Sequence, residues 1–220
     1  MAARAVAIIM DGNARWAAER DLPLLEGHRE GARTLKRTVK DAVRLGLGEL
    51  CVYAFSTENW SRPDDEVAGL MSMFADLIIS ETPELDEEGV SMRFIGRREG
   101  VGEELLQRME WAERTTAANE RLRLFVAFNY GGRAEILDAA ERYEGGGEQA
   151  FRAALYAPEM SEPDLVIRTS GESRLSNFLL WQTAYSELVF PDVLWPDFSL
   201  EHLQEALRAY EARERRFGAR

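Results

Sequence analysis

An acidic side chain, Asp11, directly follows the apolar residues 8–10, and a glycine, an amide and a guanidinium come after it in "DGNAR". A carboxylate in this position can hold Mg²⁺, which prefers one or two carboxylates together with phosphate oxygens and water. The segment "DGN" is also typical of a turn, because all three residue types tolerate tight or left-handed backbone. A turn explains why the apolar run ends, but not why Arg15 and Trp16 follow at once.

Glycine, hydroxyl, amide and arginine side chains recur after three further apolar runs, in the segments 56–62, 129–133 and 169–176. Glycines let backbone N–H groups approach an anion, and helix N-termini add partial positive charge. An arginine about 4 Å from a unit charge contributes on the order of 4 kcal/mol at an effective dielectric near 20. The motif "NYGGR" at 129–133 is equally typical of a turn, so the repetition is what favours a phosphate site.

The overall charge of the chain opposes such a site. The formal net charge is −12, which argues against a nucleic-acid partner because non-specific binding needs a basic surface. An anionic ligand must therefore be met by local positive charge. Of the 27 basic residues 25 are arginines, whose guanidinium groups suit bidentate phosphate contacts.

The elements that must position these residues follow from length and periodicity. The chain has 220 residues, 45% of them hydrophobic, and no apolar run approaches the roughly 18 residues of a membrane span. It shows no secretory signal, and its single cysteine, Cys51, lies in an apolar run, so we expect a soluble cytoplasmic protein. We predict strands at 5–10, 50–55, 91–95, 122–128, 165–168 and 187–190, and helices near 28–45, 64–82, 102–119, 133–143, 148–155 and 200–214.

Alternation of nearly continuous apolar strands with helices predicts a mostly parallel sheet covered on both faces. In such folds ligands bind beyond the carboxyl ends of the strands, where the candidate residues stand. The predicted helix at 64–82 carries apolar residues at three- and four-residue steps, typical of a core face. The same stripe would suit the wall of a tunnel for a hydrocarbon. Its members are Val67, Leu70, Met71, Phe74, Leu77 and Ile78.

Other chemistries lack their signatures. The chain has no GxxxxGK[ST] motif and no GxGxxG after its first strand, which leaves a nucleotide-binding module or phosphatase without support. A zinc cluster and a GxSxG nucleophile elbow are also absent from the sequence. Asp11 remains the one acid placed directly at a strand end among residues suited to phosphate.

Seven motifs together resemble the cis-prenyltransferase family, whose best-known bacterial member is undecaprenyl diphosphate synthase. They cover residues 5–218 and read "IIMDGNARWA", "GHREGA", "YAFSTENWSRPDDEV", "NYGGR", "DLVIRTSGESRLSNFLLWQTAYSELVF", "DVLWPDF" and "RERRFG". The resemblance implies one domain over 1–220, with a six-stranded mostly parallel sheet, flanking helices and a hydrophobic tunnel. It also implies a homodimer.

The resemblance further implies a reaction. Family members join isopentenyl diphosphate units to an allylic diphosphate, here farnesyl diphosphate, and make each new double bond cis. The product would be a polyprenyl diphosphate such as undecaprenyl diphosphate, a carrier lipid for cell-wall synthesis. Mg²⁺ is the implied cofactor, and peripheral membrane contact would serve product release.

Individual residues take implied roles from the family motifs. Asp11 matches the Mg²⁺-linked catalytic acid, Asn59 is implied to be catalytic, and Glu187 matches a second Mg²⁺ ligand. The implied substrate contacts are Gly12, Asn13, Arg15, Trp16 and His28 at the allylic diphosphate, Ser56, Trp60, Arg62 and Glu66 in the segment that closes over the substrates, Arg168, Arg174 and Ser176 at the isopentenyl diphosphate, and Arg216 and Gly218 in a terminal motif that reaches the partner subunit.

Some positions depart from the family pattern. Leu24 stands where a basic residue is frequent, and Ser173 where many members have histidine, so we place no metal at Ser173. Trans-type prenyl synthases need DDxxD motifs, and "DDEVA" ends in Ala68 instead. A non-catalytic partner subunit is a further alternative, which the retained Asp11 and Arg15 disfavour. The proton acceptor stays open among Asn13, a hydroxyl and the diphosphate itself.

Overall fold

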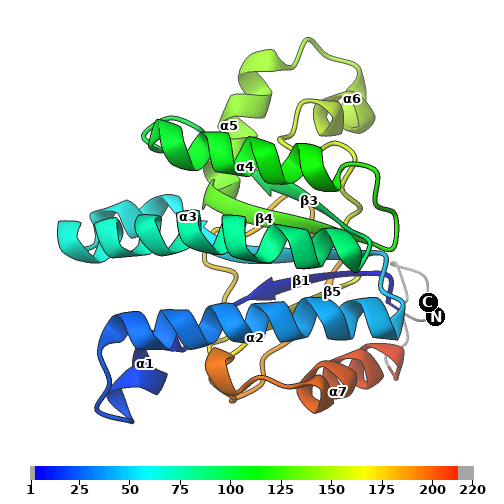
Figure 1. The fold of residues 1–220 in the computed structure, drawn as a ribbon. Helices are drawn as coiled ribbons and strands as arrows, with labels where there is room; N and C mark the ends of the chain where they lie inside the picture. Colours follow the sequence, from blue (N-terminus) through cyan, green and yellow to red (C-terminus); the bar gives the residue numbers. More distant parts are fainter. Residues whose placement is uncertain (1–2, 213–220) are drawn as a thin grey trace.

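Six apolar segments pair into one sheet in the computed structural model, which describes residues 3–212 (Figure 1). The order across the sheet is β3-β4-β2-β1-β5-β6, and each neighbouring pair is parallel. All carboxyl ends therefore lie at one edge. The strands are β1 Ala5–Ile9, β2 Glu49–Ser56, β3 Val90–Ile95, β4 Leu122–Tyr130, β5 Leu165–Arg168 and β6 Glu187–Val189.

Each face of the sheet is packed against its own apolar core. Val6 and Ile8 of β1 belong to one buried cluster, whereas Ala7 and Ile9 belong to another that includes Cys51. Successive side chains of a strand point to opposite faces, so a strand covered on both faces needs apolar residues at every position. This confirms the predicted parallel sheet and the buried position of Cys51.

Four helices contribute to the first cluster and are grouped at the front of Figure 1, while α5 and α6 stand at its top. Residues 157–179 supply much of the second cluster. The grouped helices are α2 Leu24–Leu45, α3 Asp64–Glu87, α4 Glu103–Thr116 and α7 Leu200–Glu211; the others are α1 Asn13–Ala18, α5 Gly132–Arg142 and α6 Gly147–Ala153. Among residues 3–212, no helix has the length and apolar character that crossing a membrane requires.

The structure departs from the predicted elements mainly next to β1. Helix α1 was not predicted, because a helix of six residues is too short to show a periodic pattern. Gly12 precedes it with φ of 111°, so the turn inferred from "DGN" exists and leads directly into a helix. Helix α2 begins at Leu24, four residues before the predicted start, so His28 lies inside the helix rather than at its start.

Two short 3₁₀ helices also escaped prediction: η1 Thr57–Ser61 after β2 and η2 Trp195–Asp197 before α7. In η1, Asn59 accepts a hydrogen bond from the backbone N–H of Ser56 (3.0 Å). This capping arrangement turns the chain immediately beyond the end of β2. The tertiary structure thereby holds the polar segment after β2 in a fixed shape.

Candidate active site

A cavity of about 520 Å³ opens at the carboxyl edge of the sheet, where β1 lies between β2 and β5. The chain runs from β1 to one side of the sheet and later returns to the other, which makes this a topological switch point. Eleven predicted site residues line the cavity: Asp11, Gly12, Asn13, Arg15, His28, Ser56, Asn59, Arg62, Glu66, Arg168 and Ser176.

Asp11 is held at the cavity by its own backbone. Its N–H donates to Thr169 Oγ1 (3.0 Å), and its carbonyl accepts from the Thr169 hydroxyl (2.7 Å) and from the Trp195 N–H (2.9 Å). These bonds tie the end of β1 to the segments after β5 and before α7. The carboxylate is left 34% exposed, facing a cavity that it lines.

Arg168, the last residue of β5, is the cation nearest to Asp11. Its Nη2 donates to Asp11 Oδ2 (2.8 Å), and its Nη1 donates to the Arg174 carbonyl and to Ser176 Oγ (2.6 Å each). The guanidinium is only 5% exposed, so these bonds fix its orientation. Its Nε has no hydrogen-bond partner within residues 3–212. A buried donor of this kind suits an anionic ligand.

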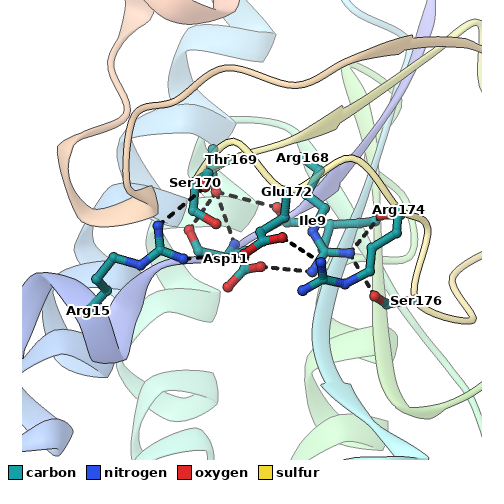
Figure 2. A network of polar contacts seen from close by, with 9 residues as sticks. All are labelled: Ile9, Asp11, Arg15, Arg168, Thr169, Ser170, Glu172, Arg174 and Ser176. Atoms are coloured by element: carbon teal, nitrogen blue, oxygen red, sulfur yellow. Dashed lines mark hydrogen bonds and ion pairs between the residues drawn. The ribbon is translucent and has the colours of Figure 1, made fainter.

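Two more arginines flank this pair and share one carboxylate. Figure 2 shows Asp11 between Arg15 and Arg168, with Glu172 and Arg174 alongside. Arg15 Nη1 donates to the Ser170 carbonyl (3.4 Å), and its Nη2 lies 3.6 Å from Glu172 Oε1. Arg174 pairs with the other oxygen of Glu172. Both arginines are largely exposed, and exposed ion pairs contribute little, so a phosphate can compete with Glu172 at small cost.

Asn13 is packed tightly against α2. A Cβ atom at Gly31 would lie 2.4 Å from Asn13 Oδ1, and one at Gly27 would lie 2.2 Å from the Asn13 carbonyl oxygen. Only glycine allows the two helices to approach this closely. The Oδ1 atom is buried and has no hydrogen-bond partner in the described part of the chain. The two glycines therefore hold an unpaired acceptor at the wall of the cavity.

His28 lies beside Asn13, and its Nε2 is likewise buried without a partner in residues 3–212. Burial, followed by the charge of Arg62, lowers the pKa of His28 to about 4, partly opposed by Glu66. The imidazole is therefore neutral at pH 7 and offers hydrogen bonding rather than charge. Arg62 and Glu66 form an ion pair of 2.9 Å at the start of α3.

Three of the predicted substrate contacts are described but do not line this cavity. Trp16 turns away from it, since its Nε1 donates to Asp197 (2.8 Å) and its ring stacks beneath Arg20. Trp60 donates to Asn129 Oδ1 (2.7 Å) and packs edge-on against Phe55. Arg174 contributes its carbonyl to Arg168 while its guanidinium pairs with Glu172. Substrate contact by these three residues stays a prediction.

Glu187 does not join Asp11 within this chain. It begins β6 and pairs in register with Leu165, which pairs with Val6. Asp11 lies five residues beyond Val6, on the order of 15 Å along the strands. Sheet register therefore separates the two carboxylates within one chain, and the role of Glu187 as a second metal ligand stays a prediction. Arg216 and Gly218 lie outside the described residues.

The motif "NYGGR" supports the turn interpretation. None of its residues lines the cavity, because β4 is separated from β1 by β2. The Gly132 N–H donates to the Asn177 carbonyl (2.7 Å), and the Arg133 N–H donates to Asn177 Oδ1 (2.8 Å). Asn177 in turn bonds Glu58 of η1 (2.7 Å). The motif thus braces the loops around the cavity.

A second, apolar cavity of about 140 Å³ adjoins the first, between the sheet and helices α2, α3 and α4. The two cavities share Met10, Asn13, His28, Ala54 and Phe74, which form their junction. Phe74, Leu77 and Ile78 line the apolar cavity, whereas Val67 and Met71 pack on the core. The apolar stripe of α3 therefore packs on the core along one part and lines the apolar cavity along another, and its use as a tunnel wall for a hydrocarbon stays a prediction.

Several contributors were not predicted individually. Thr169 fixes the Asp11 backbone, and Trp195 binds both that backbone and, through its Nε1, the Gly31 carbonyl (2.8 Å). Tyr53 lines the polar cavity and donates to the Tyr130 carbonyl (3.0 Å), and burial raises its pKa. All three stand in recognised motifs, but periodicity alone marks them only as core residues.

The described residues contain no cluster of three or more His, Cys, Asp or Glu side chains that would form a metal site. Asp11 and Glu66 are the acids at the cavity; Glu66 is paired with Arg62, whereas within residues 3–212 the Oδ1 of Asp11 makes no hydrogen bond. One carboxylate oxygen facing a cavity fits Mg²⁺ that takes its remaining ligands from phosphate and water. It does not fit a cation held by protein ligands alone.

Fold and site together define a class of protein: an α/β fold in which a cavity lined by Asp11 and arginines continues into an apolar cavity. The comparisons with known proteins agree. Residues 9–218 match the prenyltransferase family model described as "Putative undecaprenyl diphosphate synthase". The chain belongs to this family and is an enzyme of the isoprenyl transferase class.

Three relatives illustrate the match. The isoprenyl transferase of Thermotoga maritima is 50% identical over 97% of this chain and 95% of its own. That of Bacillus subtilis is 48% identical over 97% and 86%. The crystal structure of lavandulyl diphosphate synthase from Lavandula x intermedia, in complex with dimethylallyl diphosphate, superposes with a TM-score of 0.93 at 34% identity, over 99% of this chain and 98% of that one.

Proposed function

We propose that this enzyme elongates a prenyl chain in cis, by condensing isopentenyl diphosphate with an allylic diphosphate such as farnesyl diphosphate. The product would be a polyprenyl diphosphate such as undecaprenyl diphosphate, used as a carrier lipid in cell-wall synthesis. The observation that carries the proposal is the junction of two cavities, one lined by Asp11 and arginines and one apolar. The structural relative from Lavandula holds dimethylallyl diphosphate, which is itself an allylic diphosphate.

In this reaction the carbon–oxygen bond of the allylic substrate breaks and its diphosphate departs with the bonding electrons. The isopentenyl double bond attacks the allylic carbon, and a proton is then lost to form the new alkene. Arg15 would stabilise the charge that develops on the departing diphosphate, and Arg168 would hold the diphosphate of the isopentenyl substrate. Arg168 is already oriented by Asp11 and Ser176, so little reorganisation is needed when the substrate binds.

Asp11 would hold Mg²⁺, which supplies Lewis-acid stabilisation of the leaving diphosphate when bound. Asn13 and His28 stand at the junction, where the diphosphate meets its hydrocarbon, and offer hydrogen-bonding atoms without charge. Asn13, a hydroxyl and the diphosphate remain the candidate proton acceptors. Ser56, Asn59, Arg62 and Glu66 form the wall contributed by the segment after β2.

The apolar cavity would receive the growing tail. Each five-carbon unit buried there gains roughly 3–4 kcal/mol, at about 0.8 kcal/mol per CH₂ group. Tail burial then holds the intermediate between additions, while the polar cavity is refilled by a new isopentenyl diphosphate. We also propose that 1–220 acts as one domain in a cytoplasmic homodimer with peripheral membrane contact for product release.

The direct test is incorporation of radiolabelled isopentenyl diphosphate by the purified protein with farnesyl diphosphate and Mg²⁺. We expect a butanol-extractable polyprenyl product, whose length is read by chromatography. No incorporation with any allylic primer, by protein that is shown to be folded, would contradict the proposed function and favour a non-catalytic subunit.

A further inference from the structure

Two walls of the polar cavity come from strands that are not neighbours. The segment after β2 supplies Ser56, Asn59 and Arg62, and the loop after β5 supplies Ser176. Strand β1 lies between β2 and β5, so these two strands do not pair with each other in the part of the chain that the structure describes. The position of one wall relative to the other therefore depends on contacts made beyond the strand ends.

A hydrogen bond joins the two walls there, and we call it the cross-wall bond. Asn177 Nδ2 donates to Glu58 Oε1 of η1 (2.7 Å). Neither residue lines the polar cavity, but each adjoins one that does, because Asn177 follows Ser176 and Glu58 precedes Asn59. Burial alone would raise the pKa of Glu58, but its hydrogen bonds, led by that from Asn177, lower it below the usual value. The acceptor is therefore a charged carboxylate, which strengthens the bond.

The side chain of Asn177 is held at its other end by the start of α5. Its Oδ1 accepts from the Arg133 N–H (2.8 Å), and its carbonyl accepts from the Gly132 N–H (2.7 Å). Because an N–H donor requires the amide oxygen, the amide nitrogen is left to face η1. A Cβ atom at Gly131 would lie 2.7 Å from Asn177 Nδ2 and 2.6 Å from Thr57 Oγ1, so only glycine lets the two walls approach this closely.

The backbone beside the cross-wall bond needs such support. Ser176 and Asn177 have φ of 47° and 67°, in the left-handed region that residues other than glycine adopt at a cost. Ser176 Oγ accepts from Arg168 Nη1 (2.6 Å), as Figure 2 shows. A shift of Asn177 would therefore move Ser176, and with it a group that orients Arg168.

We propose that Asn177 and Glu58 are positioning residues, whose hydrogen bond holds the loop after β5 at its working distance from the segment that closes over the substrates. The inference rests on the proposed chain-elongation function, in which Arg168 and Ser176 bind isopentenyl diphosphate. With the bond in place, both walls are positioned before this substrate binds, so binding needs little rearrangement. Without it, part of the binding free energy is lost in bringing the walls together, and the KM rises while the chemical step is unchanged.

The test measures steady-state incorporation of labelled isopentenyl diphosphate with farnesyl diphosphate and Mg²⁺. Asn177→Asp keeps the side-chain shape and the acceptor for the Arg133 N–H, but it places a carboxylate against Glu58. We expect the KM for isopentenyl diphosphate to rise about tenfold, while kcat at saturation changes by less than about twofold. Adding Glu58→Gln reverses the bond, since the new amide donates to the new carboxylate. The double variant should return the KM to within about twofold of the original.

The matched control is Asn119→Asp. Asn119 Nδ2 donates to Asp86 Oδ1 (2.8 Å), and neither residue lines the polar cavity, so this variant sets two carboxylates against each other elsewhere. It should lose stability in thermal unfolding and keep its KM.

Hydrogen exchange gives a readout that does not depend on turnover. The amides of η1 should exchange faster in Asn177→Asp than in the unmodified protein, because the cross-wall bond no longer holds this segment. They should exchange at the original rate in the double variant. Equal exchange in all three proteins would contradict the inference.

The outcomes separate the two proposals. An unchanged KM in Asn177→Asp, or a raised KM that Glu58→Gln does not lower, would overturn the cross-wall inference while incorporation by the unmodified protein still supports the enzyme function. Absence of incorporation by the unmodified, folded protein would instead overturn the function. If Asn177→Asp does not fold, Glu58→Ala decides, since it removes an exposed acceptor and leaves the bonds of Asn177 to α5 intact: a raised KM supports the inference and an unchanged KM contradicts it.

Discussion

The polar cavity and the apolar cavity adjoin, yet they are built in opposite ways. The polar cavity takes most of its wall from the carboxyl ends of β1, β2 and β5 and from the segments that follow them. The apolar cavity collects residues from α2, α3, α4 and three strands, spaced along more than half of the chain. The first is specified by side-chain chemistry at strand ends, the second by the volume left between packed elements. We therefore expect substitutions in one to change rate and in the other to change product length.

The largest effect is expected at the centre of the polar cavity. Asp11→Asn keeps the shape of the side chain but removes the charge that orients Arg168 and would hold Mg²⁺. Loss of several kcal/mol of transition-state stabilisation lowers turnover by about a hundred- to a thousandfold. Incorporation of labelled isopentenyl diphosphate measures it. Asp197→Asn is the control, because Asp197 binds Trp16 outside the cavity; equal losses in both variants would argue against a specific role of Asp11.

A smaller loss of rate is expected where α2 packs against Asn13 in the wall of the polar cavity. In Gly31→Ala the new Cβ would lie 2.4 Å from Asn13 Oδ1, so Asn13 must move. Misplacement of a substrate-contacting group by about 1 Å lowers kcat/KM by roughly ten- to a hundredfold. Gly102→Ala, where the added methyl group meets open space, should leave kcat/KM unchanged. Full activity of Gly31→Ala would show that Asn13 does not need its present position.

A substitution in the apolar cavity is expected to change product length instead of rate. Leu77→Trp fills space that the tail would occupy, so we expect shorter products while the first condensation stays within about twofold of the original rate. Overpacking should cost about 1–3 kcal/mol of folding free energy. Chromatography of the products measures the effect. Ile79→Trp places the same side chain at an exposed position of α3 and should leave product length unchanged. A large loss of the first condensation in Leu77→Trp would mean that the two cavities are not separable.

The smallest effect is expected on folding stability and comes from His28, at the junction of the two cavities. The pKa of His28 is about 4 in the folded chain and 6.5 in the unfolded one, so between these values the unfolded chain binds more protons. The free energy of unfolding therefore falls as pH decreases from 6.5 toward 4. Urea unfolding at pH 5 and pH 7 should show a weaker pH dependence in His28→Gln than in the unmodified protein. His202→Gln retains His28 and should keep the full pH dependence of the free energy of unfolding. The same pH dependence in all three proteins would contradict a buried neutral His28.

The polar cavity was largely predictable, and its exceptions have physical reasons. Asp11 and Arg15 stand in the segment after β1 and Arg168 ends β5, and the carboxyl edge of a parallel sheet brings such residues together. Trp16 was assigned to the site by its neighbours in the motif, but a helix begins at Asn13 and carries Trp16 toward Asp197. Glu187 was assigned in the same way; its register on β6, which was not readable from sequence, separates it from Asp11 within one chain, and its role as a ligand stays a prediction.

For the apolar cavity, the sequence predicted only the apolar stripe on α3. The spacing of Phe74, Leu77 and Ile78 indicates a buried face of α3, but a buried face can meet a core or a cavity with the same residue types. The pairing of Lys36 with Glu81 could not be predicted, because it depends on how α2 and α3 lie against each other. Such contacts are decided by long-range packing, which the local periodicity of the sequence does not reveal.

The sequence by itself determined which segments become strands, where the chain turns at their ends, and which polar residues stand there, since these depend on local periodicity and on neighbouring side chains. Only the tertiary structure decided that β1 lies between β2 and β5, so that the residues after these three strands meet and those after β4 do not. The physical reason is that strand order and register are set by burial across the whole sheet. Each polar segment has its chemistry before folding, but it acquires its partners only when distant strands pack side by side.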